Sequence, residues 1–197
     1  MEDVSSFTQL PAARPIRSLS TGLGMGKGFA PRRAPPASFN RTPPNAEGTP
    51  CVCGSNESYA ACCKAYHEGK DAEDVIKLLR SRYSAYAYRL PEYIISTTDP
   101  SCEAYKAKTK DERNVWVEEL LNFSDNYEFD GLDVGTPEAG TQGDGEAYLN
   151  FTAKLRMLSD RVDFEERSRF VRVGSQWLYA GGDVDYEPEV KKTRRTA

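Results

Sequence analysis

Four of the five cysteines in this chain lie close together, in the pattern Cys-x-Cys-x8-Cys-Cys that is formed by Cys51, Cys53, Cys62 and Cys63. The run Gly54-Ser55-Asn56 between the two pairs is rich in turn-forming residues and can bring the pairs together. Four thiolates on one short loop suit a tetrahedral structural zinc site, with each sulfur about 2.3 Å from the metal. We therefore predict a small zinc knuckle over residues 51–69.

Disulfides and an iron–sulfur cluster are the alternative uses of these cysteines. Disulfides need an oxidising compartment, but residues 1–50 contain no signal-peptide pattern; bridges within either pair would be strained, although bridges between the pairs are conceivable. An iron–sulfur cluster usually needs more widely spaced ligands. The chain's single histidine, His67, could replace Cys63 as a ligand or could pack beside the site. Cys102 has no partner at ligand spacing and is interpreted as a buried thiol.

Residues 1–50 differ in composition from the rest of the chain. They hold eight of the twelve prolines and carry a net charge of +3, from six basic and three acidic residues. Their few periodic apolar residues predict a disordered basic extension. Their Arg and Ser/Thr content also fits a plastid or mitochondrial transit peptide, although Glu2 and Asp3 are unusual there. Without such a signal, the protein is expected in the cytoplasm.

Charge and the lengths of apolar stretches argue against two classes of partner. The whole chain has a net charge of -4, so residues 51–197 carry -4 minus +3, or -7, which disfavours a nucleic-acid partner. Residues 187–197 form a basic tail, which is usually only a solvated end. No stretch approaches the ~18 consecutive apolar residues of a membrane span, so no membrane contact is predicted.

The segment after the knuckle predicts helices followed by strands. Apolar residues at three- and four-residue spacing predict a helix that is N-capped by Asp71, spans residues 75–86 and ends before Pro91. A short helix over 93–95 and a third over 111–123 follow. Period-two patterns then predict strands over 147–157, 162–173 and 176–181, with a weaker one over 127–134 and a hairpin turn at 174–175. This order indicates an α+β fold with helices on one face of an antiparallel sheet.

The cysteine region resembles the SEC-C motif, the small zinc knuckle at the C-terminus of the SecA translocation motor. The resemblance rests on Cys51-x-Cys53-Gly-Ser-x3-Tyr59-x2-Cys62-Cys63, followed by Tyr66-His67-x-Gly69. The helix segment Arg80-Ser-Arg82-Tyr83, with Glu166-Arg-Ser168 and Trp177-x-Tyr179 later in the chain, extends the resemblance to the YchJ-like family over about residues 51–183. It implies that the four cysteines complete the metal site and that His67 packs nearby.

The same resemblance implies a nuclear transport factor two-like (NTF2-like) cone over residues 70–186. About three helices would pack on a curved antiparallel sheet and enclose a pocket, whose candidate residues are Tyr83, Tyr86, Glu166, Ser168 and Trp177. Glu166 is the best candidate for an acid–base group if the cone is catalytic. In the structural interpretation, Glu166 pairs with Arg80 or Arg82 and the tyrosines belong to the core.

These features lead to two functional hypotheses. The first is a zinc-binding, non-enzymatic protein-interaction module, because SEC-C knuckles in the translocation motor contact proteins. The alternative is a small-molecule-binding protein, or an isomerase- or dehydratase-like enzyme, that uses the cone pocket. Family members often carry histidines where this chain has Asp99 and Glu165, so catalysis here would depend on carboxylates and tyrosines. Neither the protein partner nor any pocket ligand follows from the sequence.

Overall fold

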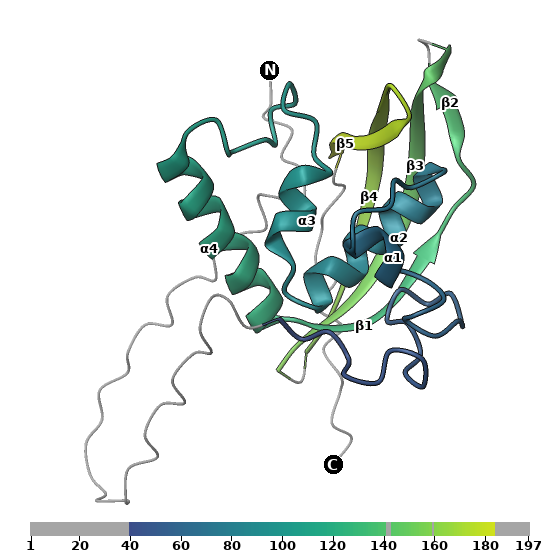
Figure 1. Cartoon of the computed structure of the whole chain (residues 1–197), viewed down its shortest axis with the longest axis vertical. Helices are drawn as coiled ribbons and strands as arrows, with labels where there is room; N and C mark the ends of the chain where they lie inside the picture. Colours follow the sequence, from purple (N-terminus) through teal and green to yellow (C-terminus); the bar gives the residue numbers. More distant parts are fainter. Residues whose placement is uncertain (1–39, 141–142, 159, 184–197) are drawn as a thin grey trace, which may run out of the picture.

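A computed structural model of the chain describes residues 40–140, 143–158 and 160–183. Within these ranges the chain forms short and long helices followed by an antiparallel sheet, which confirms the predicted α+β order (Figure 1). The elements are α1 (Lys64–His67), α2 (Val75–Ala87), α3 (Pro91–Ser96), α4 (Lys110–Asn126), β1 (Glu128–Val134), β2 (Glu138–Gly140), β3 (Gly143–Met157), β4 (Asp160–Val173) and β5 (Gln176–Asp183).

The helix ends follow from capping. The side chain of Asp74 accepts a hydrogen bond from the backbone N–H of Lys77 at 2.8 Å, so Asp74, and not the predicted Asp71, is the N-cap of α2. The longest helix, α4, begins with a reciprocal capping box between Thr109 and Glu112. It runs three residues beyond the predicted end at residue 123 and stops at Asn126.

The sheet has the strand order β1-β3-β4-β5, and β2 pairs with β3. The hairpin of β3 and β4 is its longest element, with continuous antiparallel register from Glu146 opposite Val171 to Met157 opposite Asp160. The next hairpin turns at Gly174, whose φ of 63° lies in the left-handed region that glycine adopts without strain. The predicted turn at residues 174–175 is therefore confirmed.

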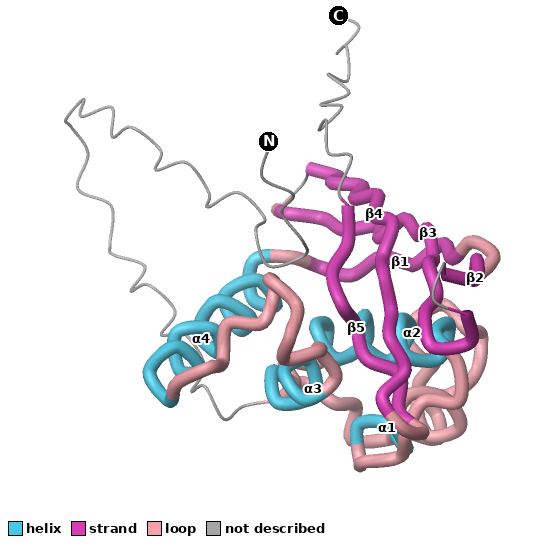
Figure 2. The backbone as a smooth tube through the Cα atoms, turned by 90° about the horizontal axis from the view of Figure 1, so that it is seen from above, coloured by secondary structure: helices cyan, strands magenta, loops and turns pink. Residues whose placement is uncertain are grey.

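The helices lie on one side of the sheet, as Figure 2 shows. Buried residues alternate along β4, so that Phe164, Glu166, Ser168 and Phe170 face the helices. Two of these four residues are aromatic, whereas Glu166 and Ser168 are buried polar residues, only 3% and 0% exposed. The face of the sheet that packs on the helices therefore combines an apolar core with one buried polar cluster.

The knuckle and the cone share one apolar core. Cys53 and Cys63 belong to the same buried cluster as Leu79 and Tyr83 of α2. The two modules that the sequence suggested are therefore packed together, and the metal site lies at their contact.

Contacts with the body begin before residue 51. The backbone N–H of Arg41 donates to the carbonyl of Tyr88, and its Nη1 donates to the carbonyl of Ser124, both at 2.8 Å. Residues 40–50 of the predicted extension therefore contact the body. The rest of that extension, with its transit-peptide interpretation, and the basic tail over 187–197 lie outside the described residues. In the described part of the chain, no helix is long and apolar enough to cross a membrane.

Candidate metal centre

The four cysteines of the motif converge into one buried cluster. Their sulfur atoms all lie within 4.8 Å of one another, and each of the four residues is buried. Cys62 Sγ is 3.5 Å from Cys53 Sγ and 3.7 Å from Cys63 Sγ. Four sulfurs placed tetrahedrally at about 2.3 Å from one ion would be about 3.8 Å apart. The cluster therefore has the dimensions of a site for a single metal ion.

The same distances exclude disulfides as the organising bonds of the described knuckle. A disulfide holds its sulfurs at about 2.05 Å, far closer than any pair here. All five cysteines, including the buried Cys102 outside the cluster, are free thiols. The donor set is thus four sulfurs, which suits a metal that prefers thiolate ligands.

Local backbone geometry brings the two cysteine pairs together. Gly54 and Asn56 have φ values of 74° and 65°, and these two left-handed residues turn the chain back after the first pair. The backbone N–H of Cys51 then donates to the carbonyl of Glu57 at 2.8 Å. Pro50 forms an isolated antiparallel bridge with Ser58, which closes the loop. Both cysteine pairs are thereby held by backbone hydrogen bonds.

The thiols of the cluster change one another's pKa. A hydrogen bond with Cys53 raises the pKa of the Cys51 thiol to about 12, and the bonds from Cys51 and Cys63 lower the pKa of the Cys53 thiol. Cys51, Cys53, Cys62 and Cys63 would hold a metal ion as thiolates, because the thiolate is the form that binds metal.

His67 lies beside the cluster and is not part of it. Its Nε2 is 2.9 Å from the carbonyl oxygen of Ser81, and a carbonyl only accepts, so Nε2 carries the proton. Its Nδ1 then accepts a hydrogen bond from the Tyr59 hydroxyl at 2.9 Å. Burial lowers the pKa of the ring and keeps it neutral. With both nitrogens engaged, the His67 ring connects the knuckle to α2.

We expect the His67→Ala variant to keep one metal ion per chain and to be less stable by about 1–3 kcal/mol, because Tyr59 and the Ser81 carbonyl lose a buried hydrogen-bond partner. Elemental analysis gives the metal content, and thermal unfolding gives the stability. Cys63→Ser is the comparison, and it should lose the metal. A His67→Ala protein with half the metal content or less would instead identify the histidine as a ligand.

Sequence reasoning assigned no role to Arg80 or Tyr59 at this site. Arg80 Nη1 donates to the carbonyl of Cys53, so α2 holds the backbone of the first cysteine pair. Tyr59 reaches His67 from the second half of the motif. Both residues belong to the quoted motifs, but their roles depend on how the knuckle docks on α2, which residue spacing does not reveal.

The predicted pocket residues divide between two places. Tyr83, Tyr86 and Ser168 line a cavity of about 20 Å3 inside the cone. Glu166 does not line this cavity, but its Oε1 accepts hydrogen bonds from the hydroxyls of Ser168 and Tyr179, which do. Trp177 is elsewhere, in a separate and larger cavity at the start of β5.

Glu166 has a buried carboxyl group with a raised pKa. Burial raises its pKa to about 7, although the hydrogen bonds from Ser168 and Tyr179 oppose this shift. Its second oxygen, Oε2, is buried and has no hydrogen-bond partner in the part of the chain that the structure describes. The expected ion pair with Arg80 or Arg82 does not form among the described residues.

Arg82 has a different role from the predicted one. Its Nη1 donates to the carbonyl of Ile94 at 3.0 Å and to Thr97 Oγ1 at 2.7 Å, at the end of α3. Its guanidinium carbon lies 4.6 Å from the centroid of the Tyr179 ring. A signal for its burial exists in the sequence, because Arg82 lies on the same helical stripe as Leu79 and Tyr86.

Gly182 on β5 provides the space that the Glu166 side chain occupies. A Cβ atom at residue 182 would overlap the Glu166 carboxyl group, with its Cδ only 2.5 Å away. We therefore expect Gly182→Ala to lower the free energy of unfolding by about 1–3 kcal/mol, the usual cost of overpacking. Gly145→Ala on β3 is the control, because a Cβ there meets no atom within 4 Å. Chemical denaturation of both variants measures the difference, and equal stabilities would contradict the crowding argument.

Comparison with known proteins identifies the family. The model of the YchJ middle NTF2-like domain matches residues 74–182, which is more than half of the chain. The chain belongs to the YchJ-like family. A UPF0225 protein of Photorhabdus laumondii is 36% identical over 135 residues, which cover 67% of this chain and 79% of the relative. A UPF0225 protein of Chromobacterium violaceum is 33% identical over 138 residues, which cover 68% of this chain and 92% of the relative.

Two solved structures share the fold of this YchJ-like chain. The solution structure of a SEC-C motif containing protein from Rhodopseudomonas palustris has a TM-score of 0.56 at 26% identity, covering 68% of this chain and 98% of the other. The crystal structure of a SEC-C motif containing protein from Psychrobacter arcticus has a TM-score of 0.55 at 21% identity, covering 72% and 86%. The predicted combination of a SEC-C-type cysteine cluster and an NTF2-like domain is confirmed.

The YchJ-like relatives named here are bacterial proteins. Bacteria have neither plastids nor mitochondria, so these comparisons give no support to the transit-peptide interpretation of residues 1–50. The segment before the cysteines also lies outside the family-model match, which begins at residue 74.

Proposed function

We propose that this YchJ-like protein is a zinc-binding protein-interaction module without catalytic activity of its own. The closed set of four buried sulfurs carries the proposal, because such a site leaves no open position for a substrate and is typical of structural zinc. The metal then serves to hold the knuckle in one conformation against α2. A rigid knuckle on a stable domain is suited to presenting a fixed surface to another protein.

The cone interior supports the non-catalytic part of the proposal. Its cavity has a volume of about 20 Å3, which is room for about one water molecule. The alternative is a small-molecule enzyme, and the observation that favours it is the buried Oε2 of Glu166, which finds no hydrogen-bond partner among the described residues. A thermal-shift screen of small carbonyl compounds tests the enzyme: a ligand that stabilises the wild type and not Glu166→Gln would support it.

Affinity capture with three forms of the full chain tests the interaction role. We expect the wild type and Cys102→Ser, which alters a buried thiol outside the cluster, to retain the same protein, and Cys62→Ser to lose it. The captured protein must then bind purified wild-type chain directly and with one-to-one stoichiometry. If all three forms retain the same proteins, or if the direct binding fails, the knuckle is not an interaction module.

A further inference from the structure

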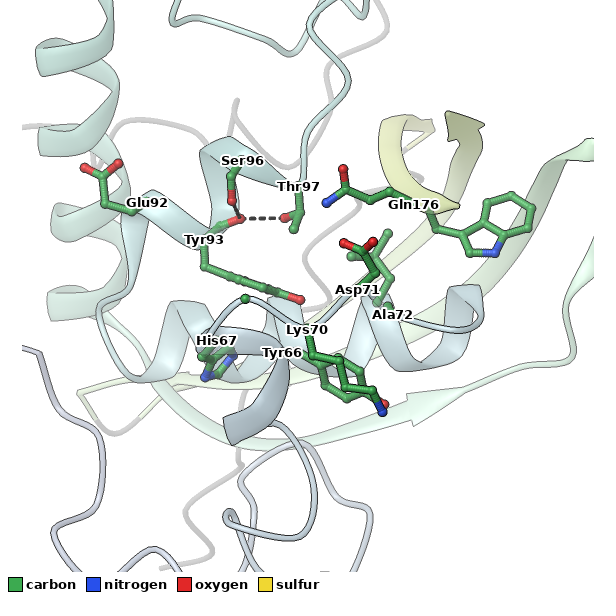
Figure 3. A pocket seen from close by; sticks show the side chains of 13 residues that line it. Tyr66, His67, Lys70, Asp71, Ala72, Glu92, Tyr93, Ser96, Thr97 and Gln176 are labelled. Carbon is green, nitrogen blue, oxygen red and sulfur yellow. Dashed lines mark hydrogen bonds between the residues drawn. The ribbon is translucent and has the colours of Figure 1, made fainter. Parts of the chain in front are cut away.

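A cavity of about 300 Å3, here called the junction pocket, lies where the knuckle meets the cone. Its walls come from α1, the loop between α1 and α2, α3 and the start of β5 (Figure 3). The volume is at the lower end of the range for small-ligand sites, ~300–1,000 Å3, and it can accept one long side chain. Neither the metal site nor the Glu166 cluster opens into it.

The aromatic wall of the junction pocket is fixed by contacts with both modules. The Tyr93 hydroxyl is 2.7 Å from Ser81 Oγ, and the Tyr93 ring packs edge-on against His67 with ring centroids 4.8 Å apart. His67 is in turn held by Tyr59 and by the Ser81 carbonyl. A wall that is ordered before a ligand arrives reduces the entropy lost on binding.

The charges in the lining leave one carboxylate without an ion-pair partner. Glu92 pairs with Arg113, and Lys70 pairs with Glu73. Among the described residues, Asp71 has no such partner. Because α2 is capped by Asp74, the Asp71 side chain is also free of any capping role.

Two polar side chains in the lining remain available to a ligand. Asp71 accepts one long hydrogen bond, from Ser175 Oγ at 3.4 Å. The Gln176 amide makes no hydrogen bond to any residue that the structure describes. In Figure 3 the Asp71 carboxylate and the Gln176 amide lie beside the same space, across from Tyr93. A ligand there meets an anion, an amide and an aromatic ring together.

On the basis of the proposed interaction role, we propose that the junction pocket binds an arginine side chain of a partner protein. A guanidinium has five N–H donors in one plane, so it can face the Asp71 carboxylate and still donate to the amide oxygen of Gln176. Its alkyl stem packs on the Tyr93 ring. Trp177 also lines the pocket, but its ring already has the guanidinium of Arg172 at 5.9 Å from its centroid, so Tyr93 is the aromatic face that the ligand contacts.

The junction pocket depends on the metal site through α1. This helix contributes Tyr66 and His67 to the lining and begins directly after Cys63. The metal therefore has a second consequence, because it fixes one wall of a binding pocket as well as folding the knuckle.

The test uses the full metal-loaded chain and a blocked tripeptide, acetyl-Gly-Arg-Gly-amide, in an NMR titration of amide and indole N–H signals. We expect saturable shifts at Asp71, Gln176 and Trp177. The matching citrulline peptide, which has the same shape without the charge, should bind at least tenfold more weakly. Free arginine, whose carboxylate faces the same acidic lining, should also bind more weakly than the blocked peptide.

Two variants locate the binding. Asp71→Asn should lower the affinity for the arginine peptide at least fivefold, and Gln176→Ala should lower it about threefold. Glu57 is an exposed carboxylate outside the pocket, so Glu57→Gln should leave this affinity unchanged. Unchanged signals away from the pocket show that each variant is folded. Equal binding of the arginine and citrulline peptides, wild-type affinity in Asp71→Asn, or no shifts at all would each overturn the proposal. Metal-dependent capture of a partner would then still support the interaction role without this pocket.

Discussion

Loss of the metal site is expected to have the largest effect on this protein. We expect Cys53→Ser to contain no stoichiometric metal and to unfold at least 10 °C below the wild type, because Cys53 is fully buried in the core that knuckle and cone share. The metal's contribution has an upper limit of ~10–16 kcal/mol, the apparent folding energy of structural zinc sites. Elemental analysis and calorimetry of the purified full chain measure both quantities.

Which residues lose structure on loss of the metal is a sharper test than how much stability the protein loses. Hydrogen exchange in the metal-free protein should lose protection over residues 49–69 and next along the α2 face that carries Arg80 and Ser81, which the knuckle contacts directly. The long β3–β4 ladder should keep its protection.

Cys102→Ser is the matched control for loss of metal, since it removes a buried thiol that lies outside the cluster. It should retain one metal ion and near-wild-type stability. A metal-free Cys53→Ser protein with unchanged exchange over residues 49–69 would show that the knuckle folds without an ion.

Periodic elements of the fold follow from the sequence, and the two shortest elements do not. The helix over residues 75–86 and the strand over 147–157 have long apolar patterns, and the structure contains both within α2 and β3. The short helix α1 and the three-residue strand β2 are too brief to show a period. Their positions depend on partners elsewhere in the chain, so spacing alone did not predict them.

The roles of side chains that connect two elements also do not follow from the sequence. Asp71 and Asp74 both precede the apolar stripe of α2, and their spacing cannot show which of them is the cap. The resemblance implies that Trp177 belongs to the cone pocket, but Trp177 lines the junction pocket, whereas Tyr179 two residues later lines the cone cavity. A parallel bridge joins Thr98 to Tyr179, which lines the cone cavity, and this tertiary contact has no signal in the sequence.

Glu166 should make the protein less stable as the pH rises from about 4.5 to about 7. Burial raises its pKa from 4.5 to about 7 in the folded chain. Between these values the folded state holds a proton that the unfolded state has released, so the free energy of unfolding falls with rising pH. Because one pKa unit corresponds to about 1.4 kcal/mol, the fall amounts to about 3 kcal/mol between pH 4.5 and pH 8.

Comparison of Glu166→Gln with the wild type isolates this contribution. Glutamine keeps the shape of the protonated side chain and does not titrate. The free energy of unfolding of Glu166→Gln, relative to that of the wild type, should therefore increase by about 3 kcal/mol from pH 4.5 to pH 8. Glu165→Gln is the control, because the adjacent carboxylate faces solvent and should leave the wild-type pH dependence unchanged. Urea unfolding at several pH values provides the measurement. A difference between Glu166→Gln and the wild type that stays constant with pH would mean that water or Arg82 stabilises the carboxylate in the folded protein, and the cone interior would then be more polar than its small cavity indicates.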